Sequence, residues 1–159
     1  MAWDLLVEEL GPRLYRFFRA RAFEDSLAAD LVQDSLLRLY EKTEAGHFDS
    51  SRGDMVTFAF GIALNIQKET YRKEKKWQFD ELEEHSHSHS SDPVESLALR
   101  KAISMLDEKE RDVIQLLVDK DLQLDEIATL LDTPLNTVKS HVFRAKKKLR
   151  DILSQGDLR

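Results

Sequence analysis

Residues 124–150 read LDEIATLLDTPLNTVKSHVFRAKKKLR, and this stretch contains two helical patterns separated by a short turn. The first pattern, residues 124–131, is a short amphipathic segment. The second is longer, because apolar residues recur in steps of three and four along one face of a helix, at Leu135, Val138, Val142, Ala145, Leu149 and Ile152. The stretch therefore predicts a short helix, a tight turn and a long helix.

The residues around the turn are those that a helix-turn-helix requires. Ala128 is small enough to stand where the two helices cross, and Val138, ten residues later, is the expected buried residue of the second helix. Asp132 occupies the position that must accept a left-handed backbone, a role that glycine fills best and aspartate tolerates. Thr133 is suited to cap the second helix, and Pro134 to fill its first position.

The polar face of the second helix has the composition of a DNA-reading surface. Residues 134–159 carry seven basic and two acidic side chains, although the whole chain has a net charge of −6. In a helix-turn-helix the leading residues of this helix reach base edges, and trailing cations meet phosphate. We predict that the leading set comprises Asn136, Thr137, Lys139, Ser140, His141, Phe143 and Arg144, and that the trailing cations are Lys146, Lys147, Lys148 and Arg150.

The rest of the chain is helical in pattern as well. Only 5 glycines and 3 prolines occur among 159 residues, and strand-like alternation is nowhere sustained. We predict an all-α protein with an N-terminal helical bundle at residues 1–77, a flexible acidic linker at 78–93 and the helix-turn-helix domain at 94–159. In the bundle, Gly11-Pro12 is expected to break or restart the first helix, and one apolar stripe is expected to contain Leu27, Leu31, Leu36 or Leu37, and Tyr40.

Composition excludes several classes of protein. Cysteine is absent, so neither a disulfide framework nor thiolate chemistry is available. No apolar run approaches the roughly 18 residues of a membrane span, and the N-terminus lacks the features of a signal peptide, so we expect a cytoplasmic protein without membrane insertion. A glycine-rich phosphate loop and a metalloprotease motif are both missing from the sequence. We therefore predict no enzyme, no catalytic residue and no cofactor.

Five segments resemble the extracytoplasmic-function (ECF) group of RNA polymerase sigma factors. Residues 29–40 and 62–73 resemble that family's N-terminal motifs, and residues 106–114, 126–128 and 136–150 resemble its C-terminal region. Together they extend over about residues 5–77 and 93–153 in the family's order. Asn136 stands where the family usually has glycine, His141 where it has arginine, and Phe58 where it has tryptophan.

The resemblance implies a role in promoter recognition. It implies that the helix-turn-helix binds the −35 element, with Lys139, Ser140, Phe143 and Arg144 as the leading candidates. The bundle is expected to bind the clamp helices of the largest subunit of core RNA polymerase through Asp30, Gln33, Asp34 and Arg38, and the −10 element through Asn65, Glu69, Arg72, Lys73 and Lys76. Further partners implied by the family are promoter DNA, the flap of the second-largest subunit and an anti-sigma factor.

Two other functions stay open at this point. A two-domain transcriptional regulator would bind operator DNA through the helix-turn-helix without polymerase, commonly as a dimer. A metal-responsive interaction protein would use His85, His87 and His89, which alternate along the linker. We expect no metal site there, because the segment offers neither a preformed geometry nor an evident fourth ligand.

Overall fold

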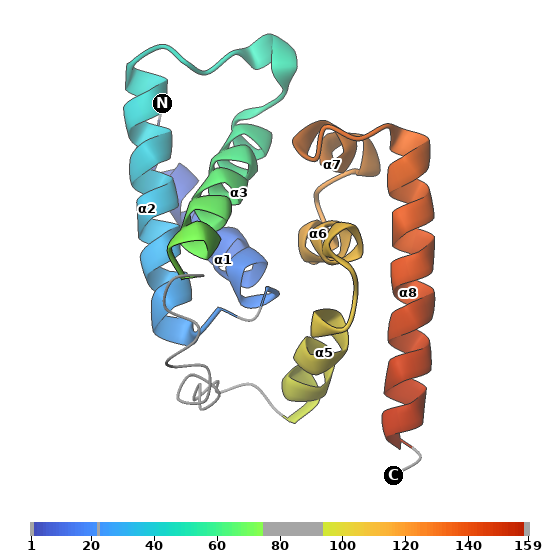
Figure 1. Ribbon diagram of the computed structural model, residues 1–159. Coiled ribbons are helices and arrows are strands. Elements are labelled where there is room, and N and C mark those ends of the chain that lie inside the picture. Colours follow the sequence, from blue (N-terminus) through green and yellow to red (C-terminus); the bar gives the residue numbers. More distant parts are fainter. Residues whose placement is uncertain (1, 22, 75–93, 158–159) are drawn as a thin grey trace. The chain divides into compact units, whose positions relative to one another are not determined.

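The computed structural model describes residues 2–21, 23–74 and 94–157, which form two compact units (Figure 1). Within these ranges the chain is helical and contains no strand, so the predicted all-α fold class is confirmed. The linker predicted at 78–93, together with Lys76 and the three alternating histidines, lies outside the described residues.

The first unit is a bundle of three long helices. They are α1 (Trp3–Arg19), α2 (Asp25–Glu44) and α3 (Met55–Glu74), with a short 3-10 helix, η1 (Ser50–Arg52), between α2 and α3. Figure 1 shows α2 and α3 side by side, with α1 crossing behind them. Aromatic rings fill the centre, where Phe17 of α1 meets Phe60 of α3 edge to face at 5.6 Å between ring centroids.

The predicted break at Gly11-Pro12 is wrong, because α1 runs without interruption from Trp3 to Arg19. A proline inside a helix cannot donate to the carbonyl four residues earlier, which costs about 3 kcal/mol relative to alanine. Burial on both sides of the proline offsets that cost, since Leu10 and Leu14 are completely buried. Each such side chain contributes about 1.5–3 kcal/mol, so tertiary packing outweighs the local preference.

The apolar stripe predicted for α2 is partly correct. Leu31 is buried as expected, but Tyr40 is exposed, and Leu39, its neighbour in sequence, fills the core instead. The ring of Trp3, at the start of α1, packs against the Tyr40 ring at an angle of 59°, with 5.0 Å between centroids. Tyr40 therefore lies on the surface of the bundle, where it holds the beginning of α1.

The second unit contains α5 (Val94–Ser104), α6 (Glu108–Leu117), α7 (Leu124–Leu130) and α8 (Leu135–Asp157). The long helix α8 packs against each of the other three. Its apolar stripe is buried as predicted at Val138 and Ala145, which meet a core that includes Val113, Leu116 and Ile127.

Candidate nucleic-acid interface

The second unit contains the predicted helix-turn-helix in α7 and α8. Asp132 has a φ of 50° and is the only non-glycine residue with positive φ among the described residues. This left-handed residue turns the chain so that the Thr133 N–H donates to the Ala128 carbonyl at 3.0 Å. The turn prediction for Asp132 and the burial prediction for Val138 are confirmed, and Ala128, predicted to stand at the helix crossing, is buried.

The start of α8 differs slightly from the prediction. The helix begins at Leu135, and the carbonyl of Pro134 accepts the first helical hydrogen bond, from the Val138 N–H at 3.0 Å. Thr133, predicted to be the cap, donates its hydroxyl to the Leu131 carbonyl at 2.9 Å. Thr133 thus stabilises the turn, and Pro134, with its fixed φ, precedes the helix.

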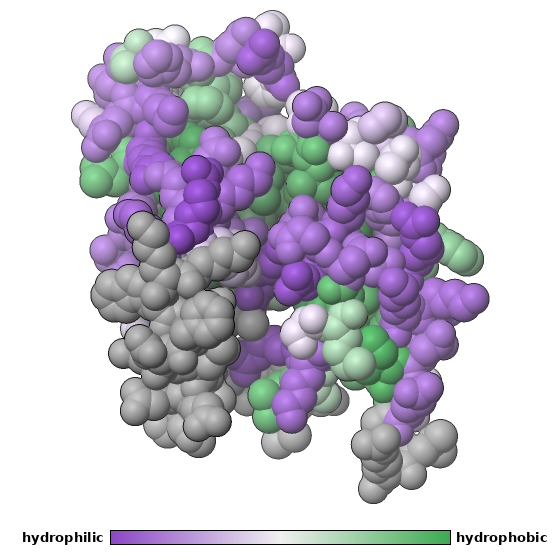
Figure 2. Space-filling view, in the orientation of Figure 1, coloured by the Kyte–Doolittle hydropathy of each residue, from purple (hydrophilic) through white to green (hydrophobic). Residues whose placement is uncertain are grey.

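The outer face of α8 carries almost all the residues predicted to bind the −35 element. Figure 2 shows hydrophilic side chains along much of this helix. Phe143 is 66% exposed among them, which leaves its aromatic ring accessible on this face. The exposed residues of the predicted set are Asn136, Thr137, Lys139, Ser140, Phe143, Arg144 and Lys147.

His141 is the exception, because only 9% of it is exposed. It lies three residues after Val138 and four before Ala145, on the buried side of the helix. Its neighbourhood contains Asp107, the residue that caps α6. The structure therefore turns His141 toward the body of its own unit, away from the exposed face that holds the other seven residues.

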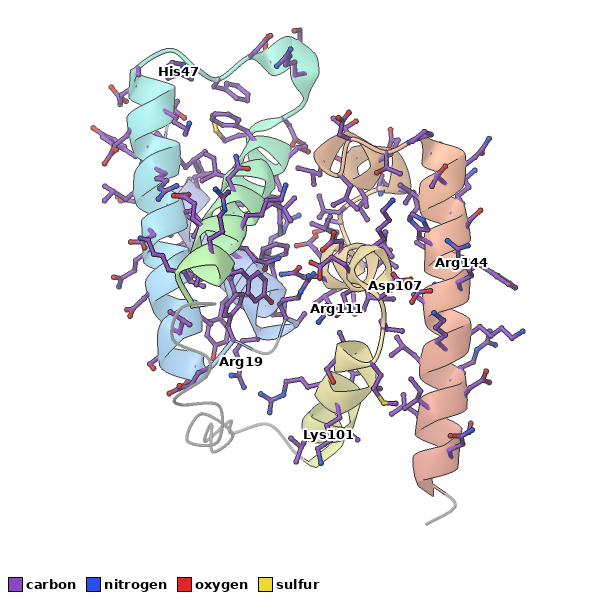
Figure 3. All side chains as sticks on the ribbon, in the orientation of Figure 1. Arg19, His47, Lys101, Asp107, Arg111 and Arg144 are labelled. Atoms are coloured by element: carbon purple, nitrogen blue, oxygen red, sulfur yellow. The ribbon has the colours of Figure 1, made fainter. Side chains whose placement is uncertain are left out.

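Acidic groups at the start of α6 face the basic helix α8 (Figure 3). The backbone N–H of Glu110 donates to the Asp107 carboxylate and lowers the pKa of Asp107 below its ordinary value. Burial opposes this change, and the nearby charges of Lys148 and Arg144 lower the pKa further. The anionic form of Asp107 is favoured by the positive charge of α8.

In the first unit, the predicted −10 residues lie along α3. Asn65, Arg72 and Lys73 are exposed, whereas Glu69 is engaged with α2. Both oxygens of the Glu69 carboxylate accept from the Arg38 guanidinium, at 2.5 and 3.2 Å. Hydrogen bonding within this pair lowers the pKa of Glu69 and raises that of Arg38.

The residues predicted to bind polymerase lie on α2, and the structure distinguishes Arg38 from the others. Asp30, Gln33 and Asp34 are exposed, while Arg38 makes the ion pair with Glu69. Leu37 is exposed on the same helix, three residues after Asp34 and four after Gln33. Sequence reasoning missed Leu37 as a surface residue, because it left the apolar stripe undecided between Leu36 and Leu37.

The segment between α2 and α3 is shaped by local hydrogen bonds. The Asp49 carboxylate accepts from the Ser51 hydroxyl at 2.7 Å and from the Ser51 backbone N–H at 3.0 Å, which lowers the pKa of Asp49. Gly46 has a φ of 81°, which a glycine adopts without strain. The ring of Phe48 packs against Phe58 of α3 with 5.4 Å between centroids. The segment is thereby tied to the helix that carries the predicted −10 residues.

Metal-binding clusters and membrane-spanning helices are both absent from the ranges that the structure describes. Among residues 2–21, 23–74 and 94–157, no group of three histidine, cysteine or acidic side chains could hold a metal ion. Within the same ranges, no helix combines the length and the apolar character needed to cross a membrane.

Two solved structures share this fold. The structure of CnrH in complex with the cytosolic domain of CnrY gives a TM-score of 0.76 at 23% identity, over 97% of this chain and 88% of that one. The sigma factor RpoE in complex with the anti-sigma factor NepR from Bartonella quintana gives 0.72 at 21% identity, over 95% and 96%. At these identities the two structures establish likeness of fold.

Sequence comparison identifies the family. Residues 6–77 match the model described as Sigma-70 region 2, and residues 96–149 match the one described as Sigma-70, region 4. The chain is also 28% identical over 159 residues to the ECF RNA polymerase sigma factor RpoE of Cereibacter sphaeroides, covering 96% of this chain and 87% of that protein. With both regions present in this order, the chain belongs to the ECF family of RNA polymerase sigma factors.

Proposed function

We propose that this sigma factor binds core RNA polymerase and directs it to promoters by holding one promoter element with each unit. Residues 1–77 form the −10 and polymerase-binding domain, residues 78–93 the linker, and residues 94–159 the −35-binding domain. Sigma factors are initiation factors without enzymatic activity, so no catalytic residue or cofactor is assigned. The exposed polar and basic face of α8 is the observation that carries the proposal.

The −35 element is bound by the exposed face of α8. Its polar side chains are suited to base edges in a major groove, and Arg144 in particular suits a guanine. Phe143 offers an apolar surface to a thymine methyl group. Lys147 lies one turn beyond, where a cation neutralises phosphate. His141 is left out of this set because its side chain is buried.

The −10 element is bound by α3, and polymerase by α2. Asn65, Arg72 and Lys73 are the exposed residues that meet the separated strand, for which cationic and aromatic groups are suited. Asp30, Gln33 and Asp34 supply an acidic and polar face to the polymerase clamp. Arg38 and Glu69 are already paired with each other in the structure.

A reconstituted transcription reaction tests the proposal. The chain is added to core RNA polymerase and fragmented bacterial genomic DNA, and the 5′ ends of the RNA are sequenced. We expect discrete start sites, preceded by a shared sequence pattern, only when both proteins are present. A chain that binds duplex DNA but does not associate with polymerase would be a regulator of the independent type and would refute the proposal.

Matched variants assign the two interfaces. Lys139→Ala combined with Arg144→Ala should abolish selection of the −35 element, whereas Lys101→Ala, at an exposed position of α5, should not. Asp30→Ala combined with Asp34→Ala should weaken association with polymerase, and Glu8→Ala, at an exposed position of α1, serves as its control. Equal losses in variants and controls would contradict the assignment of these faces.

An anti-sigma factor is a further expected partner. The RpoE of Bartonella quintana has been solved with the anti-sigma factor NepR, and its fold is shared by this chain. We infer a protein that binds this chain and blocks its association with polymerase. Affinity capture with the full chain, followed by inhibition of the reconstituted transcription reaction by the captured protein, tests the inference. A captured protein that leaves transcription unchanged would not be an anti-sigma factor.

A further inference from the structure

A buried carboxylate lies under the basic helix of the second unit. Glu110, in the first turn of α6, is only 1% exposed. Its Oε1 atom accepts two hydrogen bonds, one from the Lys148 Nζ atom of α8 at 2.9 Å and one from the Asp107 backbone N–H at 3.1 Å. An ionised carboxylate is costly to bury without a partner, and the ammonium group of Lys148, on a side chain that is 50% exposed, supplies that partner at the surface of this unit.

The Glu110 carboxylate is also held by hydrogen bonds at the start of α6 itself. Asp107 and Glu110 form a reciprocal capping box, in which each side chain accepts from the other residue's backbone N–H. A capping box satisfies two backbone donors at once and fixes the first turn of a helix. The Glu110 carboxylate is therefore a hydrogen-bond acceptor at a fixed point on α6, and Lys148 of α8 donates to it.

Helical phase separates Lys148 from its neighbour Lys147. Lys148 lies three residues after Ala145, which is completely buried, so it emerges at the edge of the packed side. Lys147 lies three residues after Arg144 and four after Phe143, both on the exposed face. The two lysines carry the same charge, but of the two only Lys148 forms an ion pair with a buried carboxylate, that of Glu110.

We propose that Lys148 is a positioning residue, which fixes the recognition helix α8 on the start of α6 through Glu110 and neutralises no DNA phosphate. The inference rests on the proposed function, in which α8 binds the −35 element. It also changes which cations of the 146–148 run bind phosphate, because the ammonium group of Lys148 is already paired with the Glu110 carboxylate. The orientation of the exposed face of α8 then depends on Asp107 and Glu110 at the start of α6, although the predicted DNA contacts all lie on α8.

The salt dependence of DNA binding distinguishes the two roles of a lysine. Each phosphate neutralised adds about −0.9 to the slope of log affinity against log salt. A lysine that only positions the helix alters the affinity equally at every salt concentration and leaves the slope unchanged. Lys147→Met and Lys148→Met remove the same charge from adjacent positions, so they form a matched pair.

The experiment uses holoenzyme assembled from core polymerase and the full chain. Its affinity for a promoter duplex obtained from the transcription reaction is measured over a series of salt concentrations. We expect Lys147→Met to flatten the slope by about 0.9, and Lys148→Met to keep the wild-type slope while weakening binding about threefold to tenfold throughout. Lys148→Arg should restore the affinity, because it keeps a cation for Glu110.

Two outcomes overturn the inference. One is a slope for Lys148→Met that flattens as much as that of Lys147→Met, and the other is unchanged affinity together with unchanged slope. Should wild-type holoenzyme fail to bind the duplex at all, the proposed function fails instead, so the two failures are distinguishable.

A second variant guards against loss of folding in Lys148→Met. Glu110→Gln keeps an oxygen for the capping box and removes the buried charge that holds Lys148. The losses of affinity in Glu110→Gln and in the double variant with Lys148→Met should be alike, because both break one interaction. Additive losses would show that the two residues act separately and would overturn the inference. Circular dichroism of each chain confirms that helix content is preserved.

Discussion

The Arg38–Glu69 ion pair should contribute measurably to the stability of the first unit. It joins α2 to α3 across 31 residues of sequence through two hydrogen bonds, at 2.5 and 3.2 Å. The two side chains are 41% and 40% exposed, so solvent weakens the attraction. Exposed pairs are typically worth about 0.2–1 kcal/mol, and the two-bond geometry places this one toward the upper end, at about 0.5–1 kcal/mol.

A double-mutant cycle measures this contribution. Arg38→Met, Glu69→Gln and the double variant are unfolded in urea, and the free energies of unfolding are compared with that of the parent. The parent carries Trp77→Phe, so that Trp3 is the remaining one of the 2 tryptophans and its fluorescence reports on the first unit. The coupling energy between the two changes is the quantity sought.

The pH dependence supplies a sharper criterion. The Arg38 hydrogen bond lowers the pKa of Glu69 below its ordinary value of 4.5, so the folded state binds a proton less readily than the unfolded state. The stabilisation is therefore fully present above that value and is lost as pH falls through the lower, folded pKa. A coupling energy of zero near neutral pH, or one that is unchanged in acid, would refute the reasoning.

Three further predictions concern single side chains. Asp132→Gly should raise the free energy of unfolding by about 0.5–1 kcal/mol, because glycine adopts the φ of 50° without strain; a lower melting temperature would contradict this. Pro12→Ala should stabilise the chain by about 2 kcal/mol, as measured by urea unfolding. Alanine gains about 3 kcal/mol of helix propensity over proline, and about 1 kcal/mol of this is lost because the unfolded chain becomes less restricted. Phe143→Ala should leave stability within about 0.5 kcal/mol, since the ring is 66% exposed, while weakening holoenzyme binding to −35 DNA about fivefold; a destabilised chain would point to a core role.

Local patterns predicted the second unit well because its determinants are close together in sequence. The step of three and four residues from Val138 to Ala145 identifies the buried side of α8, and both residues are fully buried. Asp132 was predicted to turn left-handed from its place four residues after Ala128, and its φ is 50°. A turn residue and a repeating apolar face are properties of the chain itself, so no tertiary information was needed.

The first unit contains features that local patterns could not supply. Pro12 was expected to break a helix, since the cost of proline is local while the burial of Leu10 and Leu14 that offsets it is tertiary. Arg38 and Glu69 were assigned to different interfaces, because nothing in a single sequence indicates that residues 31 apart form an ion pair. Only the packing of α2 against α3 brings the two charges together.

His141 shows how family resemblance and helical phase complement each other. Resemblance aligns it with an arginine and so suggests a DNA contact, yet its spacing from Val138 and Ala145 places it on the side that packs. The spacing is a property of this chain's own helix, and the structure agrees with it, because the His141 side chain is only 9% exposed. Because DNA can only be read by side chains that reach it, we expect changes in −35 preference to arise from the exposed positions around Phe143. A change at His141 would act through the packing of α8 on α6, as we propose for Lys148.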